Sequence, residues 1–356
     1  MLSSGPSNRS RLYPFSICYP FEYVKVVSLK VLVLYTEELA NAIQETLGDK
    51  AVVVRSERTV ESMLEHARDA DIVVSGRVAA DYIREAPNLK MIQALGAGID
   101  KIDRQAVLDR GDIIVCNNHM NAMEVAEYAI MLLLATAKNI ILSDRELRKG
   151  DWIFGFGGPN PNVEIRNKTC LIMGLGNIGA EIAKRLKGFD LELRAVTRSG
   201  ESPNADLVDS MTSLKEMRPY VQDADFIILS LPLTHESRGI IDGEVISWMK
   251  SSAILVNVSR GEIVDEAALY QALKDRQIQA AGLDVWWNYP QWGKPDMKMP
   301  SLNFPYHELD NVVMSPHRAA YSLNTRQAHL DFIRENVLRF VCGERPLNIV
   351  DMNLGY

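Results

Sequence analysis

The sequence predicts an α/β protein with two doubly wound parallel sheets and a cleft between the two units. Three observations support this prediction. The chain has 356 residues, which is long enough for two domains. Short β-rich runs alternate with helical segments from Lys30 onward, and the alternation restarts at Thr169 after a long apolar helix. Such alternation is typical of a parallel sheet covered by helices on both faces.

The composition limits the classes of function. Hydrophobic residues make up 47% of the chain and charged residues 24%, as in a globular protein. A chain with a net charge of −7 does not attract polyanions, so we expect no nucleic-acid and no membrane partner. Four scattered cysteines without a CxxC pair are typical of a reducing compartment, which predicts a cytoplasmic protein without a metal site. The longest apolar stretch, 128–137, is about half of a membrane span and predicts a buried helix.

Residues 1–29 differ from the rest of the chain. They are rich in Ser, Arg, Pro and Gly, and Pro6, Pro14 and Pro20 prevent a helix across them. The segment also lacks the continuous apolar run that a signal peptide needs. We therefore expect a poorly ordered amino-terminal extension outside the two domains.

The first α/β unit contains five predicted strands. We place them at residues 31–35, 51–54, 71–75, 90–94 and 113–116. A helix is predicted over 37–47, and the unit ends in the apolar helix 122–137. Together with the last part of the chain, these elements predict a substrate domain formed by 30–136 and 320–356.

The second unit contains six predicted strands with helices between them. The strands lie at residues 169–173, 193–197, 226–229, 253–258, 279–283 and 312–315. Helices are predicted over 177–188 and 265–274, and an amphipathic helix over 322–341 precedes a polar tail. Six alternating strands match a doubly wound dinucleotide-binding sheet, so 137–319 is the predicted cofactor domain.

Three glycines follow the first strand of this second unit. Gly174, Gly176 and Gly179 form a G-x-G-x-x-G pattern. The first permits a tight turn, the second leaves room for a pyrophosphate, and the third lets the helix pack close to the strand. The pattern alone is weak, but here it follows a strand and opens an amphipathic helix. It therefore predicts a Rossmann domain that binds NAD or NADP.

The next strand indicates which dinucleotide is preferred. An acidic residue at its end would accept a hydrogen bond from the ribose 2′-hydroxyl of NAD. The strand ends instead in Thr197, Arg198 and Ser199, and the arginine and serine suit a 2′-phosphate. This favours NADP over NAD; the alternative is a solvated arginine after a strand.

Four further segments complete a pattern together with the glycine turn. They are 96–100, 256–264, 281–285 and 314–319. In this order and spacing they resemble the D-isomer-specific 2-hydroxyacid dehydrogenases, a family that includes glyoxylate/hydroxypyruvate reductases and D-lactate, D-glycerate, phosphoglycerate and formate dehydrogenases. The resemblance implies a flavodoxin-like substrate domain beside the Rossmann domain, and a homodimer. It also implies an NAD(P)-dependent hydride transfer between a small 2-oxoacid and its D-2-hydroxyacid.

The chemistry of such a transfer needs two kinds of side chain. A proton moves on or off the 2-oxygen, which requires an acid/base that titrates near neutrality. His317 follows Pro316 at the end of the sixth strand and matches the catalytic histidine of the family. His119 is a weaker candidate, and the other histidines are expected at the surface. Arg260, also at a strand end, supplies the charged fork that a substrate carboxylate needs.

The resemblance extends to the residues around these two. Gly96, Ala97 and Gly98 match the loop whose backbone amides bind the substrate carboxylate. The predicted cofactor site comprises Gly174, Gly176, Asn177, Ile178, Gly179, Thr197, Arg198, Ser199, Leu231, Pro232, Thr234, Val258, Ser259, Arg260, Asp284 and His317.

One expected catalytic position departs from the family pattern. Hydroxyacid members have a glutamate five residues after Asp284, which pairs with the histidine and raises its pKa. This chain has Tyr289 there, so His317 should be less basic. Either the tyrosine hydroxyl hydrogen-bonds the imidazole, or Tyr289 packs in the cleft and His317 acts alone. Because formate dehydrogenases have a glutamine at this position, a formate dehydrogenase-like enzyme stays open, as does a dinucleotide-sensing regulator without turnover.

Aromatic residues gather after the same motif. Trp286 and Trp287 precede the segment 291–307, which adds another tryptophan, a phenylalanine and a tyrosine. These side chains either shape an apolar substrate pocket or belong to the core or a subunit interface.

Overall fold

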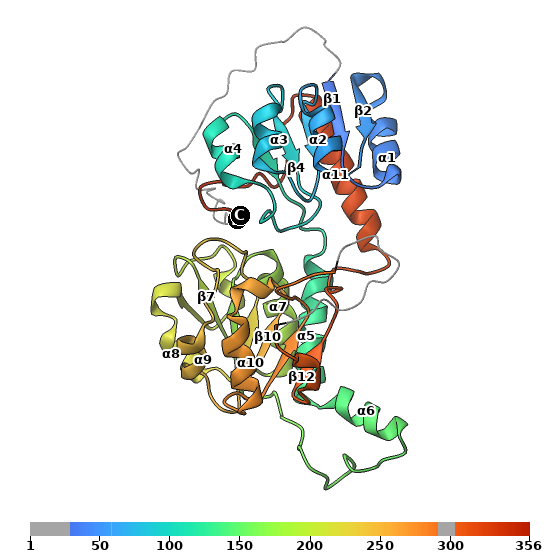
Figure 1. Ribbon diagram of the computed structural model, residues 1–356. Coiled ribbons are helices and arrows are strands. Elements are labelled where there is room, and N and C mark those ends of the chain that lie inside the picture. The colour runs from blue at the N-terminus through green and yellow to red at the C-terminus, as the bar shows by residue number, and fades with distance from the viewer. Residues whose placement is uncertain (1–28, 58, 291–302) are drawn as a thin grey trace, which may run out of the picture.

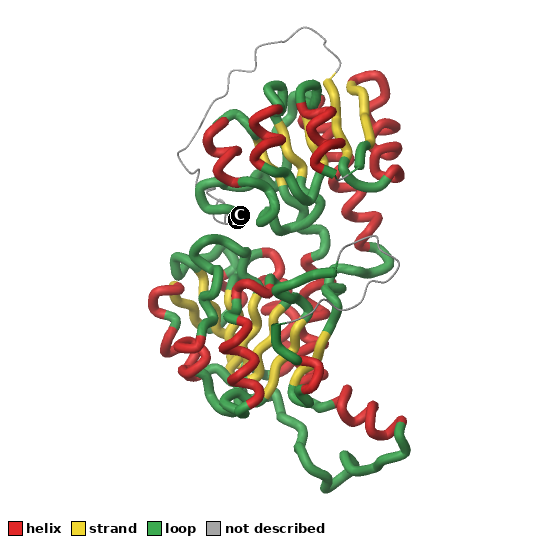
Figure 2. The backbone as a smooth tube through the Cα atoms, in the orientation of Figure 1, coloured by secondary structure: helices red, strands yellow, loops and turns green. Residues whose placement is uncertain are grey.

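The computed structural model describes residues 29–57, 59–290 and 303–356. The chain forms two lobes, each with its own sheet (Figures 1 and 2). The predicted extension lies outside the described residues except for Leu29, which begins the first strand. Residues 291–302 of the aromatic segment also lie outside them.

The first lobe contains a five-stranded parallel sheet in the order β2-β1-β3-β4-β5. This is the flavodoxin-like order, and it confirms the predicted fold class. The strands are β1 (Leu29–Val33), β2 (Ala51–Arg55), β3 (Ile72–Val74), β4 (Met91–Gln93) and β5 (Ile114–Cys116).

Five helices cover the two faces of this sheet. Side chains alternate along β1, so Val31 and Val33 point to one face and Leu32 to the other. The first face is packed by α1 (Glu37–Leu47) and α11 (Thr325–Val341). The second is packed by α2 (Val60–Ala67), α3 (Ala80–Glu85) and α4 (Arg104–Arg110).

The second lobe contains a seven-stranded parallel sheet in the order β8-β7-β6-β9-β10-β11-β12. The chain reverses direction across the sheet between β6 and β9, which is the switch point where dinucleotides bind. The six predicted strands are all present. The seventh, β8, was missed because its sequence Ser-Met-Thr-Ser has no buried run. The strands are β6 (Thr169–Met173), β7 (Glu192–Thr197), β8 (Ser210–Ser213), β9 (Phe226–Leu229), β10 (Ile254–Asn257), β11 (Ala280–Leu283) and β12 (Val312–Met314).

Helices also cover both faces of the second sheet. One face is packed by α8 (Arg218–Asp223), α9 (Gly243–Trp248) and α10 (Glu266–Lys274), and the other includes α7 (Asn177–Leu186). Asp265 caps α10 by accepting a hydrogen bond from the amide of Ala268 at 2.8 Å, which explains where that helix begins. Short 3-10 turns lie at Gly48–Lys50, Lys187–Phe189, Ala205–Leu207, Leu214–Glu216, Gly261–Ile263 and Tyr306–Glu308.

Helix α5 (Ala122–Ala137) packs against the second sheet, although we expected it to end the first domain. Its residues Ala129 and Leu133 share a core with Ile172 and Val256. An added Cβ at Gly282 of β11 would lie 3.1 Å from the Cβ of Leu132, so the helix and the strand are in close contact. The packing therefore places α5 with the cofactor domain, and the boundary expected at 136/137 is wrong because α5 buries its apolar surface there.

An arm extends from the second lobe beyond α5. It consists of α6 (Ile140–Arg148) and the loop 149–168, and both views show it pointing away from the body of the molecule (Figures 1 and 2). Among the described residues no single helix has the length and apolar character to cross a membrane, and the consecutive pair α5 and α6 is bent by 62°.

The aromatic residues after β11 belong to the core of the second lobe. The ring of the fully buried Tyr306 stacks on Trp287 at 5.5 Å and meets Trp286 edge-on at 6.2 Å. The ring of Phe304 stacks on Tyr270 at 5.1 Å. Of the two interpretations, core packing therefore applies to the described aromatics.

Candidate functional site

Two cavities lie at the carboxyl ends of the strands. The first, called here the glycine-turn cavity, is lined by the glycine turn, the end of β7 and the segment after β9; its predicted residues are Gly174, Gly176, Thr197, Arg198, Ser199, Leu231, Pro232 and Thr234. The second, the interdomain cavity, is lined by residues of both lobes; its predicted residues are Gly96, Ala97, Gly98, Ile178, Val258, Arg260, Asp284, Tyr289 and His317.

The glycine turn has the geometry that a pyrophosphate needs. Gly174 has φ +96°, and an added Cβ would lie 2.8 Å from the carbonyl oxygen of Ser230. An added Cβ at Gly179 would lie 1.9 Å from the carbonyl oxygen of Gly174, so α7 packs closely on the turn. At Gly176 the same atom would meet nothing within 4 Å. The turn therefore leaves open space at the amino end of α7, where backbone amides favour an anion.

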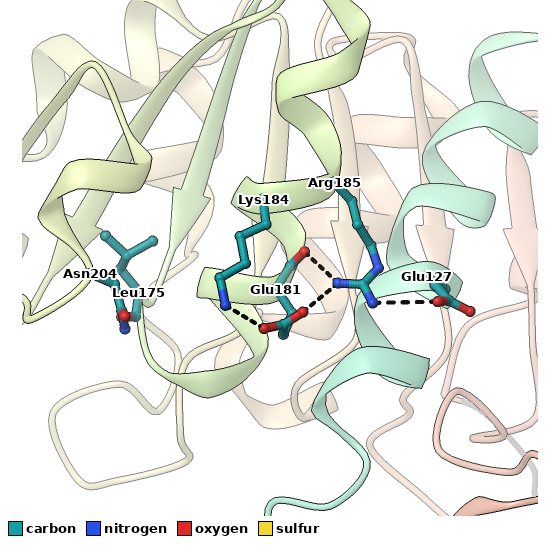
Figure 3. Close-up of polar contacts among 6 residues, drawn as sticks. All are labelled: Glu127, Leu175, Glu181, Lys184, Arg185 and Asn204. Carbon is teal, nitrogen blue, oxygen red and sulfur yellow. Dashed lines mark hydrogen bonds and ion pairs between the residues drawn. The ribbon is translucent and has the colours of Figure 1, made fainter.

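Ion pairs hold α7 in position. Glu181 accepts hydrogen bonds from Lys184, at 2.7 Å, and from Arg185 (Figure 3). The guanidinium of Arg185 also reaches Glu127 of α5 at 3.4 Å. Below the turn, the side-chain amide of Asn204 donates to the carbonyl oxygen of Leu175 at 3.1 Å. The Arg185–Glu127 pair thus links α7 to α5, and the Asn204 hydrogen bond ties the glycine turn to the segment after β7.

The end of β7 turns sharply within the glycine-turn cavity. The buried hydroxyl of Thr197 accepts a hydrogen bond from the amide of Gly200 at 3.0 Å and donates to the carbonyl oxygen of Glu201 at 3.1 Å. The turn leaves Arg198 and Ser199 exposed on the cavity wall. Glu201 lines the same cavity, a carboxylate missed from the sequence because it lies four residues beyond the strand end.

The side chain of Arg260 reaches from the second lobe to the first. It follows β10, and its side chain forms a double contact with one carboxylate oxygen of Asp100, at 3.1 Å from Nε and 3.0 Å from Nη2. The approach is close because residue 98 is glycine: an added Cβ there would lie 1.9 Å from Nη2. The guanidinium is therefore oriented toward the Gly96–Gly98 loop and already binds a carboxylate.

The loop that carries His317 is held by Asp284. The buried carboxylate of Asp284 accepts hydrogen bonds from the hydroxyl of Ser315 at 2.5 Å and from the amides of Arg318 at 2.9 Å and Ala319 at 3.0 Å. His317 itself has φ +54°, a left-handed conformation that costs a non-glycine residue about 1–3 kcal/mol. Asp284 therefore offsets this strain by bonding the loop on both sides of His317.

The surroundings of His317 favour its neutral form. The imidazole faces the cleft and stays accessible, but the protein around it displaces enough water to lower its pKa. The positive charge of Arg260 is the next cause of the lowered pKa, and Lys101 adds to it. The carboxylates of Asp284 and Asp100 act in the opposite direction and do not compensate.

Tyr289 packs against His317 without a hydrogen bond to it among the described contacts. The two ring centroids lie 5.2 Å apart at 49°. The hydroxyl of Tyr289 instead accepts a hydrogen bond from the amide of Trp286 at 3.1 Å. The ammonium of Lys101 lies 5.9 Å from the centroid of the same ring. The geometry thus agrees with the packing interpretation and leaves the imidazole without the carboxylate of the family.

Some predicted residues do not line either cavity. Gly179 is buried under the turn, and the buried Ser259 donates to Asn257 at 2.9 Å. Asn177 begins α7 and is exposed. His119 is also absent from the lining of both cavities. The prediction that His329 lies at the surface is wrong. This residue of α11 is partly buried, and its Nδ1 lies 3.1 Å from the carbonyl oxygen of Leu95.

Several lining residues were missed from the sequence, and four of them have charged or aromatic side chains that bear on the proposed chemistry. Asp100 ends the motif segment 96–100 and Lys101 follows it, so this motif was the available signal. Glu201 follows the β7 turn. Tyr356 is far from the glycine turn in the sequence, and the fold brings it to the glycine-turn cavity.

Comparisons with known proteins identify the family of the chain. The family model described as D-isomer specific 2-hydroxyacid dehydrogenase, NAD binding domain, matches residues 130–319. The chain is 36% identical over 334 residues to the D-3-phosphoglycerate dehydrogenase of Methanocaldococcus jannaschii; the match covers 90% of this chain and 60% of that protein, so the chain spans about three fifths of that relative's length. It is 31% identical over 314 residues to the glyoxylate reductase of Pyrococcus horikoshii, covering 86% of this chain and 89% of that one.

A solved structure shares both the fold and part of the sequence. It is the NADPH-dependent glyoxylate/hydroxypyruvate reductase of Sinorhizobium meliloti in complex with NADP and malonate. The TM-score is 0.74 at 28% identity, and the match covers 91% of this chain and 97% of that one.

Proposed function

The chain belongs to the D-isomer specific 2-hydroxyacid dehydrogenase family of NAD(P)-dependent oxidoreductases, and from this we propose that it interconverts a small 2-oxoacid and its D-2-hydroxyacid. The observation that carries the proposal is the meeting of Arg260 and His317 in the interdomain cavity, beside the open face of the glycine turn. Arg260 can bind a carboxylate and His317 can transfer a proton, and the reaction needs both from side chains in this cavity.

The geometry supports the following proposed roles. Arg260 binds the substrate carboxylate with its fork, and the Gly96–Gly98 loop lines the same cavity. The residues of the glycine turn would hold the dinucleotide, whose nicotinamide would exchange a hydride with the substrate C2. In reduction, a ring N–H of protonated His317 gives its proton to the carbonyl oxygen, which becomes the hydroxyl. In oxidation, neutral His317 takes that proton back. Tyr289 excludes water from one face of the imidazole.

We propose NADPH as the preferred cofactor. Arg198 and Ser199 line the glycine-turn cavity at the end of β7, where a 2′-phosphate would lie. Glu201 lines the same cavity and would favour the 2′-hydroxyl of NADH. The arginine is closer to the strand end, which is the position that selects between the two cofactors.

A panel of 2-oxoacids tests the proposal. We expect the purified protein to reduce at least one of glyoxylate, hydroxypyruvate, pyruvate, phenylpyruvate and 2-oxoisocaproate, with a higher kcat/KM for NADPH than for NADH. The loss of reduced cofactor is followed by absorbance. If the protein bound NADPH tightly but turned over none of these acids, that result would contradict the proposed enzymatic activity. It would favour a dinucleotide-sensing regulator.

We also propose that the protein is a cytoplasmic homodimer, joined through the arm. Large apolar side chains of the arm are more than half exposed: Ile140, Ile141, Leu147, Trp152, Ile153 and Phe156. Exposed apolar surface of this extent on one projecting segment is typical of a subunit contact. A second copy is the partner we expect, because dimers that bury the same patch on both subunits are the commonest oligomers.

Charge placed on the arm should separate the two copies. The double variant Ile153→Glu/Phe156→Glu is expected to change the mass measured by light scattering from twice 39.9 kDa to 39.9 kDa. Val52→Glu is the matched control, because Val52 on β2 is as exposed as Ile153, at 51% each. A wild-type protein that is already monomeric would show that the arm has another role.

A further inference from the structure

Residues 351–356 cross from the first lobe to the glycine-turn cavity. In Figure 1 this end of the chain lies between the two lobes. Tyr356 lines the cavity together with Gly176, Arg198 and Thr234. The guanidinium carbon of Arg198 lies 5.8 Å from the centroid of the Tyr356 ring, a cation–π contact between the lobes. An added Cβ at Gly355 would lie 3.6 Å from Cγ2 of Thr234, so the backbone of the segment also touches the second lobe.

The segment is anchored firmly to the first lobe. The amide of Val350 donates to the carbonyl oxygen of Val115 at 2.8 Å, beside β5. Arg104 of α4 donates to the carbonyl oxygens of Met352 at 2.6 Å and of Asn353 at 2.5 Å. The side chains of Val350 and Met352 are buried in the core of that lobe. Tyr356 is therefore held in place by substrate-domain contacts while its ring faces a cofactor-domain residue.

The turn that ends the segment directs the ring. The amide of Gly355 donates to the carbonyl oxygen of Asp351 at 2.8 Å, and Gly355 has φ +84°. This left-handed conformation, which glycine adopts without strain, turns the chain toward the cavity. Tyr356 is 43% exposed, so part of its side chain remains accessible beside the guanidinium.

We propose that Tyr356 is part of the dinucleotide site, and that it couples the substrate domain to the adenosine half of the cofactor. This rests on the proposed function, because it requires a nicotinamide dinucleotide in the glycine-turn cavity. The ring shields one side of the Arg198 guanidinium from water. A shielded guanidinium binds an anion more strongly than a fully hydrated one, so Tyr356 strengthens recognition of a 2′-phosphate. The bound cofactor then contacts both lobes.

Cofactor binding measured without turnover tests this inference. We expect Tyr356→Ala in the full chain to raise the Kd for NADPH, followed by nucleotide fluorescence, by about 2- to 30-fold, the fold-change that a cation–π contact represents. The Kd for NADH should rise less, because NADH lacks the 2′-phosphate. Tyr356→Phe keeps the ring and should bind NADPH like wild type. Tyr321→Ala is the matched control, because Tyr321 also covers an arginine, Arg318 at 5.6 Å, outside the cavity.

The outcomes separate this inference from the proposed function. Wild-type Kd for NADPH in Tyr356→Ala, with wild-type circular dichroism, overturns the role of Tyr356 and leaves the enzyme proposal intact. Equal weakening in Tyr356→Phe also overturns it, because the ring would then not be the contacting group. A wild-type protein that binds neither NADPH nor NADH contradicts the proposed function itself.

Discussion

Replacing His317 with asparagine should lower kcat for 2-oxoacid reduction by about 10²- to 10⁴-fold, which is the usual contribution of a positioned acid/base. The imidazole faces the interdomain cavity, and the Asp284 hydrogen bonds hold the loop that carries it. Steady-state kinetics with NADPH measures the loss. The Kd for NADPH should change little, because the glycine turn and Arg198 are intact. A variant with wild-type kcat would show that another group moves the proton.

The same residue sets the pH dependence. Reduction needs protonated His317, so kcat/KM for the 2-oxoacid should fall as the pH rises through the pKa of His317. The surrounding protein and Arg260 lower that pKa, so the fall should begin below the pH at which an ordinary histidine titrates. Tyr289→Glu is the matched variant, because a carboxylate beside the imidazole raises its pKa and moves the profile to higher pH. An unshifted profile in Tyr289→Glu would show that His317 does not control the step.

Replacing Arg260 with alanine should lower kcat/KM for the 2-oxoacid by about 10²- to 10³-fold, the loss expected for a charged pair of hydrogen bonds to a carboxylate. Its guanidinium lines the interdomain cavity, and the contact with the carboxylate of Asp100 at 3.0 Å orients it there. We expect most of the loss in KM. Initial rates over a range of substrate concentrations measure it.

Two further variants sharpen this result. Arg260→Lys keeps the charge without the planar fork and should recover only part of the loss. Arg345→Ala removes an exposed arginine of the polar tail and should leave kcat/KM unchanged. If the Arg260→Ala variant turned over an amide analogue of the substrate as poorly as it turned over the acid, the loss would not depend on the carboxylate. Arg260 would then act by orienting the two domains and not by orienting the substrate carboxylate.

Much of the fold could be predicted because its signals are local. The buried strand sequences of β6, β9 and β10 and the glycine spacing each lie within a few residues, and the order of the elements then restricts the topology. Strand β8 escaped prediction because its four residues are only partly buried. Helix α5 was predicted correctly as a helix but placed with the wrong domain. Its apolar surface does not show which sheet will cover it.

The candidate site divides in the same way. The sequence by itself determined the α/β class and the dinucleotide turn, and it singled out Arg260 and His317 as candidates for the chemistry, because each lies in a short motif at a strand end. Only the tertiary structure decided that Arg260 pairs with Asp100, that the Tyr289 hydroxyl bonds Trp286, and that Tyr356 covers Arg198. Two of these contacts join segments more than a hundred residues apart, and the third depends on side-chain direction. The spacing of residues along the chain indicates neither these distant contacts nor the direction of a side chain.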